Sequence, residues 1–258
     1  MLSQQWGRYS LPFKGEGLAG WVQRTKQAKP IAFEALVYLC GGAYVSLARL
    51  LDNATWYADR SFSYAMAGTF TGYLIDRFGL DAYKTFYSAA NERNFLSKFE
   101  LVFGASLRDV ERGWRDALLA VRDSYEPELG RAVGERRVER AYNRWELIFC
   151  IEQAEALALA GKATPRALWF AAWAHRLLRN FDDAADLLQR ILHVDDVSLQ
   201  AWRSAVWVEL GQLNDLRDRR EEALRAYEKA LAEAEPGGES SRQDARQGME
   251  RPFLEPGD

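Results

Sequence analysis

Residues 59–79 have the sequence DRSFSYAMAGTFTGYLIDRFG, and this stretch sets the fold class of the chain. Asp59 or Ser61 can cap the start of a helix, because a short polar side chain accepts a hydrogen bond from an N–H group of the first turn. Large apolar side chains then recur at helical spacing as far as Phe78. Gly79 follows, and glycine commonly ends a helix. The stretch therefore predicts one long helix.

Similar start and stop signals follow downstream. Asp81 opens a further helix, and a short helix is expected from Asn94 to Gly104. Ser106 begins an S-x-x-D capping pattern that predicts a helix over residues 107–121. No alternating apolar and polar pattern bounded by turn residues is found, so no strand is expected. These signals predict an all-α protein.

A longer helix is predicted over residues 130–159. Its first part is dense in charges of both signs, which indicates a solvated face rather than a ligand-binding patch. Gly161 would end it. Thr164 and Pro165 then form a helix cap followed by proline at the first helical position.

Composition and charge narrow the function classes. The chain has 258 residues, enough for one large domain or two small ones with a sizeable core. Its formal net charge is −3, and no basic stripe stands out, so we expect no nucleic-acid partner. Cys40 and Cys150 lie in apolar segments and are expected to be reduced, buried thiols.

No membrane segment is expected. The first residues lack the apolar region of a signal peptide. The most apolar run, Ala35–Ala48, is shorter than the roughly 20 residues that span a bilayer, and Gly41-Gly42 interrupts it. We therefore expect a buried helix there and a soluble chain, and the sequence leaves the compartment open.

Residues 165–236 contain large and small side chains at the spacing of helical hairpins. In the clearer copy, Gly211 and Ala223 would let two antiparallel helices approach closely, while Trp207 and Tyr227 would fill the space between hairpins. The segment resembles a pair of tetratricopeptide repeats (TPRs). The residues of this copy are Trp207, Leu210, Gly211, Ala223, Tyr227, Ala230 and Pro236, and those of a weaker preceding copy are Leu168, Ala171, Ala172, Ala184 and Leu188.

The offset between the two copies exceeds the usual TPR period of about 34 residues, and a longer first helix in the second copy would account for that. An ordinary helical bundle is the alternative. From Pro236 the chain is poor in apolar residues, which predicts a disordered tail. The domain prediction is therefore residues 1–125, residues 126–235 with the repeats, and a tail at 236–258.

The first of these regions resembles the distal half of gluzincin zinc metallopeptidases. Leu11–Val22 matches the third-ligand pattern P-x-x-x-E-G-x-A of that family. An ordered series follows, Y-x-x-A-G-x-F, Y-L-x-x-x-x-G, F-G-x-S-L and E-x-x-W, and the resemblance covers residues 10–121. It implies an all-helical half-domain packed against a short array of TPR-like hairpins.

The resemblance also implies site residues. Glu16 matches the third zinc ligand, and Tyr64 matches the tyrosine that stabilises the developing oxyanion. The family takes its other two ligands and its general base from an H-E-x-x-H helix, and this chain has none. Its two histidines, His175 and His193, lie far downstream and are expected to be structural or surface residues.

Each candidate also has a structural interpretation. Glu16 near a helix start gains from the helix dipole without any metal, and Tyr64 can be a packed aromatic residue with a satisfied hydroxyl group. Because one carboxylate cannot hold a catalytic zinc, we expect zinc in the parent family and none bound by this chain alone.

Three hypotheses on function remain open. In the first hypothesis, the chain is the C-terminal portion of a metallopeptidase-like protein with TPRs. It is inactive as given, and missing sequence would complete its active site. Alternatively it is a non-catalytic scaffold whose repeats bind a protein or peptide, with His175, Asn214 and Arg217 as candidate contacts. The third hypothesis is a structural helical domain with no site.

Overall fold

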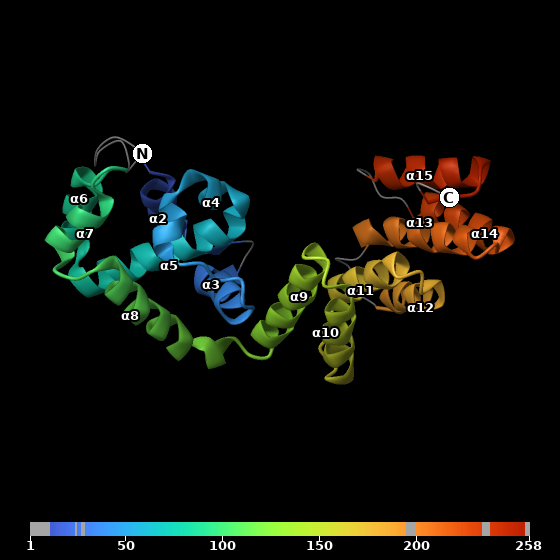
Figure 1. The fold of residues 1–258 in the computed structure, drawn as a ribbon, viewed down its shortest axis with the longest axis horizontal. Helices are drawn as coiled ribbons and strands as arrows, with labels where there is room; N and C mark the ends of the chain where they lie inside the picture. Colours follow the sequence, from blue (N-terminus) through green and yellow to red (C-terminus); the bar gives the residue numbers. More distant parts are fainter. Residues whose placement is uncertain (1–10, 24, 27–28, 195–199, 234–237, 256–258) are drawn as a thin grey trace. The chain divides into compact units, whose positions relative to one another are not determined.

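The structure is a computed structural model that describes residues 11–23, 25–26, 29–194, 200–233 and 238–255. These residues are almost entirely helical (Figure 1), which confirms the predicted all-α class. The chain forms two compact units that divide between Val133 and Gly134. The division falls after the predicted boundary at residue 125, because Leu129 is buried in the core of the first unit.

The first unit contains short helices around α5. Its helices are α2 (Pro12–Gln23), α3 (Ile31–Cys40), α4 (Asn53–Ala58), α5 (Arg60–Phe78), α6 (Leu80–Ala89), α7 (Phe95–Phe103) and α8 (Leu107–Ala120). Two 3-10 turns, η1 (Leu47–Leu51) and η2 (Arg122–Tyr125), and a two-residue antiparallel pair, β1 (Thr25–Lys26) and β2 (Lys29–Pro30), connect them. Helix α9 (Glu128–Asn143) leads from this unit into the second.

Several predicted helix ends are confirmed by their hydrogen bonds. Asp59 caps α5 by accepting from the backbone N–H of Phe62, and Gly79 ends that helix. Ser106 caps α8 through the N–H of Asp109. Thr164 in the second unit caps a helix through the N–H of Ala167. Local capping chemistry therefore fixes these boundaries.

The core of the first unit is aromatic and is centred on Phe70 of α5. The Phe70 ring lies 6.1 Å from Phe13, 6.2 Å from Phe99 and 5.7 Å from Trp114, measured between ring centroids. All four side chains are buried. Helices α2, α5, α7 and α8 are thus joined through one cluster of rings.

The predicted buried helix over Ala35–Ala48 is only partly present. Helix α3 ends at Cys40, and Gly42 has a φ of 72°. The chain becomes helical again only at Leu47, as a 3-10 turn. The positive φ at Gly42 suits glycine and breaks the helix there. Neither cysteine is in a disulfide; Cys150 is buried and Cys40 half-buried.

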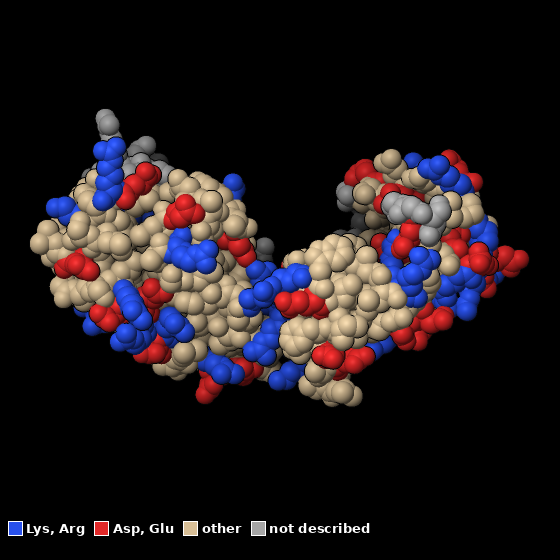
Figure 2. Space-filling view, in the orientation of Figure 1, with Lys and Arg blue, Asp and Glu red and all other residues tan. Residues whose placement is uncertain are grey.

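The second unit is built from helices that follow one another in the chain and pack on their neighbours. After α9 these are α10 (Leu147–Leu159), α11 (Pro165–Leu177), α12 (Phe181–Leu192), α13 (Gln200–Leu216), α14 (Arg220–Ala232) and α15 (Glu239–Glu250). Helix α11 packs on α12, α12 on α13, α13 on α14, and α15 on both α13 and α14. On the face seen in Figure 2, basic and acidic side chains are intermixed over this unit, as on a solvated surface.

The single helix predicted over residues 130–159 is wrong, because the chain breaks it after Asn143. Trp145 has a φ of 60°, and the N–H of Glu146 donates to the carbonyl of Ala141 at 3.0 Å. This bond, across five residues, is a Schellman-type helix end, which is usually built with glycine. Here a tryptophan that is 73% exposed occupies the left-handed position, so no glycine signals the break.

The disordered tail predicted from Pro236 is also wrong for residues 239–250, which form α15. Only Ala245 and Gly248 of this helix are buried. They suffice because Tyr227 of α14 lies directly against Gly248, where a Cβ atom would collide with the phenol ring. A helix that packs through small residues needs little apolar content, so its composition alone suggested disorder.

None of the helices in the described part of the chain combines the length and the apolar character needed to cross a bilayer.

Candidate functional sites

Glu16 and Tyr64 are brought together by the packing of α2 on α5. Glu16 lies in the second turn of α2 and Tyr64 in the second turn of α5, and both side chains are half-buried. The helices approach closely because glycines face each other. A Cβ atom on Gly17 would lie 2.9 Å from the carbonyl oxygen of Ala67, and one on Gly20 would lie 3.2 Å from the Cα atom of Gly68. No larger residue fits at Gly17 without moving α5.

The Tyr64 hydroxyl group lies beside the Glu16 carboxylate. Burial is the largest cause that raises the pKa of Tyr64, and the neighbouring Glu16 carboxylate raises it further. The Trp56 ring, 5.7 Å from the Tyr64 ring, supports the phenol from the side. The two residues that the sequence singled out are therefore one interacting pair.

Lys14 fixes α2 from its buried side and was not singled out by the sequence. It is 3% exposed, and its ammonium group donates to the carbonyl oxygen of Tyr87 at 2.8 Å and to that of Ala90. These carbonyls lie at the end of α6, where a cation is favourable. The Tyr87 ring adds a cation–π contact at 5.0 Å. Burial lowers the pKa of Lys14.

Glu111 is a second buried charge of the first unit. It belongs to the E-x-x-W element noted in the sequence. Its carboxylate accepts hydrogen bonds from the Tyr44 hydroxyl group and, at 3.1 Å, from the backbone N–H of Leu47. Burial and the Glu111 carboxylate raise the pKa of Tyr44. The role seen here is structural, because Glu111 caps η1 and ties it to α8.

The residues around Glu16 do not fit a zinc site. A catalytic zinc takes three protein ligands. Within the described ranges no group of three histidine, cysteine, aspartate or glutamate residues could hold a metal ion. Both histidines belong to the second unit: His175 Nδ1 lies 3.8 Å from Asp183 Oδ2, and His193 Nδ1 lies 2.9 Å from the carbonyl oxygen of Gln189. Among the described residues, Glu16 therefore has Tyr64 beside it and no second metal ligand.

In the second unit, Asp215 joins α13, α14 and the segment after α15. Its side chain is 0% exposed. It accepts hydrogen bonds from the Tyr227 hydroxyl group at 2.9 Å, from Arg220 at 2.9 Å and from the backbone N–H of Phe253 at 2.8 Å. Burial first, and then Asp215, raises the pKa of Tyr227. These three donors satisfy the buried carboxylate.

Tyr227 of α14 packs against Gly211 of α13 and Gly248 of α15. It is fully buried, and its ring lies so close to Gly211 that a Cβ atom there would collide with it. Trp207 packs differently, since its indole N–H donates to Glu233 at 3.0 Å and Lys229 lies over its ring at 4.3 Å. The small residues Ala184 and Ala223 are both fully buried.

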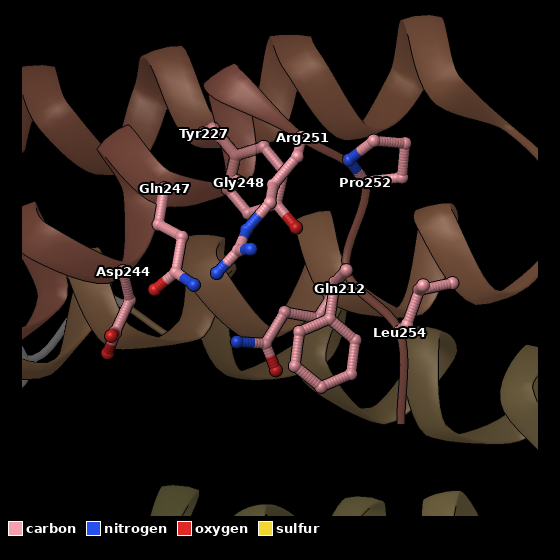
Figure 3. A pocket seen from close by; sticks show the side chains of 9 residues that line it. Gln212, Tyr227, Asp244, Gln247, Gly248, Arg251, Pro252 and Leu254 are labelled. Atoms are coloured by element: carbon pink, nitrogen blue, oxygen red, sulfur yellow. The ribbon is translucent and has the colours of Figure 1, made fainter. Parts of the chain in front are cut away.

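A pocket with a cavity volume of about 350 Å³ lies between α13, α15 and the segment that follows α15. In Figure 3 the side chains of Gln212, Gln247 and Arg251 point into this space. Polar side chains of α13 and α15 thus line this pocket together with the non-helical segment that follows α15.

The polar contacts predicted for the repeats lie elsewhere. Arg217 forms an ion pair with Asp182 of α12, and His175 faces Asp183 of the same helix. The Asn214 carbonyl oxygen accepts the N–H of Arg219 at 2.8 Å and closes α13. Sequence reasoning missed Arg176 and Asp215, because nothing local distinguishes them from surface charges.

Comparisons with protein-family models, with curated proteins and with solved structures find no match for this chain.

Proposed function

We propose that residues 10–121 are the distal half of a gluzincin-like metallopeptidase domain, and that this chain alone does not hydrolyse peptides. Glu16 is the third-ligand position and Tyr64 the oxyanion-stabilising position of that half. The closeness of these two side chains, which the packing of α2 on α5 brings about, is the observation that supports the proposal. Residues matched independently, 48 positions apart in the sequence, meet on neighbouring helices as one site requires.

The inactivity follows from the ligand count. A zinc peptidase needs two histidines one helical turn apart and a general base. The only histidines, His175 and His193, lie in the second unit and face other partners. A segment with an H-E-x-x-H helix, outside residues 1–258, would have to complete the site.

The first test measures zinc content and zinc-dependent peptide hydrolysis by the 258-residue chain, and we expect neither. The second test extends the reading frame upstream of the Met1 codon and expresses the longer polypeptide. If that stretch encodes H-E-x-x-H, Glu16→Gln should lower zinc content, whereas Tyr64→Phe should lower kcat and leave zinc content unchanged. Peptide hydrolysis by the 258-residue chain would refute the proposed inactivity. An upstream reading frame that does not encode H-E-x-x-H would refute the proposal that Glu16 and Tyr64 are half of a zinc site.

A second candidate function is peptide binding by the TPR-like second unit. The observation that favours it is the extended stretch Arg251–Glu255, which already lies against Arg176 and Asp215. Helical repeats bind extended peptides through such polar side chains on a continuous face.

Selection of random displayed peptides on the full chain tests this candidate. Enriched peptides should lose binding to the Arg176→Gln variant and keep it with Arg246→Gln, a change at an exposed site on α15. Peptides that bind both variants equally would use another surface, and the absence of any enriched peptide would oppose the function.

A further inference from the structure

After α15 the chain leaves the helix and turns back on the second unit. Arg251 has φ −149° and ψ 147°, which is extended backbone, and Pro252 to Glu255 have no helical or strand structure. This stretch, which we call the return segment (Arg251–Glu255), contacts α11 and α13. These are the first helices of the two hairpins.

The backbone of the return segment is held by a buried charge. The N–H of Phe253 donates to Asp215 Oδ2 at 2.8 Å. Arg220 holds the same carboxylate from the other side and also donates to the carbonyl oxygen of Met249 at 2.9 Å. A contact with a backbone N–H is independent of sequence, so Asp215 would hold any extended peptide placed there.

The side chains of the return segment are held by one arginine. The Arg176 guanidinium lies 4.9 Å from the Phe253 ring centroid, and its Nε donates to Glu255 Oε1 at 3.4 Å. Its side chain is only 17% exposed, because Glu209 at 2.5 Å and Gln212 at 2.9 Å orient it from α13. Arg176 thus contacts an aromatic ring and a carboxylate two positions further along.

The return segment is lightly held and leaves space beside it. Phe253 and Glu255 are half-buried, while Leu254 between them is 68% exposed. The cavity of about 350 Å³ beside Arg251 is within the usual range for ligand pockets, roughly 300–1,000 Å³. A segment with few buried side chains and free volume beside it can be displaced by a better-fitting ligand.

We propose that the return segment is an internal ligand that covers the peptide-binding surface of the second unit. The partner it stands in for is an extended peptide with an aromatic residue followed, two positions later, by a carboxylate. This inference rests on the peptide-binding candidate above. Binding of such a partner requires release of the return segment, so the covered state lowers the apparent affinity by the fraction of molecules that are covered.

The test measures binding of a fluorescent peptide, ERPFLEP, which has the sequence of residues 250–256, to the full chain by fluorescence anisotropy. The variant Phe253→Ala/Glu255→Gln releases the chain's own segment and keeps the surface intact. We expect it to bind the peptide about tenfold more tightly than the unchanged chain, as if roughly nine molecules in ten were covered.

Three controls locate the effect. Leu254→Ala, at the exposed position between the two anchors, should leave the affinity unchanged. Adding Arg176→Gln to the releasing variant should abolish binding, with circular dichroism to confirm that the helices persist. The altered peptide ERPALQP, which keeps only the backbone contact with Asp215, should bind every variant far more weakly than ERPFLEP does.

Equal affinity of the unchanged chain and the releasing variant would overturn the inference, as would tight binding after loss of Arg176. Displayed peptides of other chemistry could bind the chain through Arg176 with the same affinity for the unchanged chain and the releasing variant. That result would support the peptide-binding function and refute the proposal that the return segment is an internal ligand. If neither ERPFLEP nor any displayed peptide binds any variant, both fail.

Discussion

In the first unit, Phe70 contacts rings from three other helices that are distant in the sequence, whereas in the second unit each helix packs mainly on the helices next to it in the chain. The stability of the first unit therefore depends on all its helices together. In the second unit, the stability of each helix depends mainly on its contacts with the adjacent helices.

The same contrast applies to the buried charges. Lys14 binds carbonyl groups 73 and 76 positions away, and Glu111 binds partners 64 and 67 positions away. Asp215 has Arg220 and Tyr227, which are 5 and 12 positions away, among its partners. The pair Glu16 and Tyr64 therefore lies in a unit whose buried charges bind distant segments, while Asp215 binds mainly the neighbouring helix α14.

Phe70→Ala should have the largest effect on stability, and that effect should be confined to the first unit. Removing a fully buried ring is expected to cost about 3–5 kcal/mol of stability. Hydrogen exchange should rise across α2, α5, α7 and α8 together and stay unchanged in α13. Leu96→Ala, at an exposed position of α7, is the matched control. Faster exchange confined to α5 would contradict the cooperative framework.

Asp215→Ala should follow, with a cost of about 2–3 kcal/mol, because the buried Tyr227 hydroxyl group and Arg220 lose a charged acceptor. The change should remain local. Exchange should rise in α13, α14 and α15 and little in α11. Glu228→Ala, on the exposed side of α14, should have almost no effect. Loss of protection in α11 equal to that in α14 would remove the distinction between the units.

Gly17→Ala should cost about 1–3 kcal/mol, since the added methyl group would press on the Ala67 carbonyl. The free energy of unfolding measured with denaturant gives this value. Ala19→Ser, at an exposed position of the same helix, should be neutral. A neutral Gly17→Ala would mean that α2 and α5 are not pressed together.

The smallest effect is expected from titration of Tyr64. Its folded-state pKa is raised, so its contribution to stability is present below about pH 10 and is lost as pH rises through that pKa. Glu16→Gln should lower the pKa towards the ordinary value without reaching it, because burial is the larger cause. NMR of ring-labelled tyrosine, with Tyr64→Phe to assign the signal, measures the change. An unchanged pKa would mean that the two side chains do not interact.

Much of the helical framework was predictable because its signals are local. Caps such as Asp59 and Ser106 act within one turn, and Gly79 ends its helix where expected. These features can be recognised without knowing the tertiary contacts.

The remaining features depend on contacts distant in the sequence or on residues in unusual roles. Trp145 takes a backbone conformation typical of glycine, and α15 packs through Gly248 on Tyr227 rather than through an apolar stripe. Arg176 and Asp215 are important only because a later segment returns to them. No periodicity in the sequence marks such residues.

The position of Lys14 has a chemical consequence. A buried ammonium group that donates to two carbonyl oxygens is shielded from amine-reactive reagents, while an exposed lysine such as Lys162 is accessible to them. Lys14 should therefore be modified only when α2 separates from the end of α6. Mass spectrometry of its labelling rate would measure how often that opening occurs and would report whether Glu16 and Tyr64 are held together in a given sample.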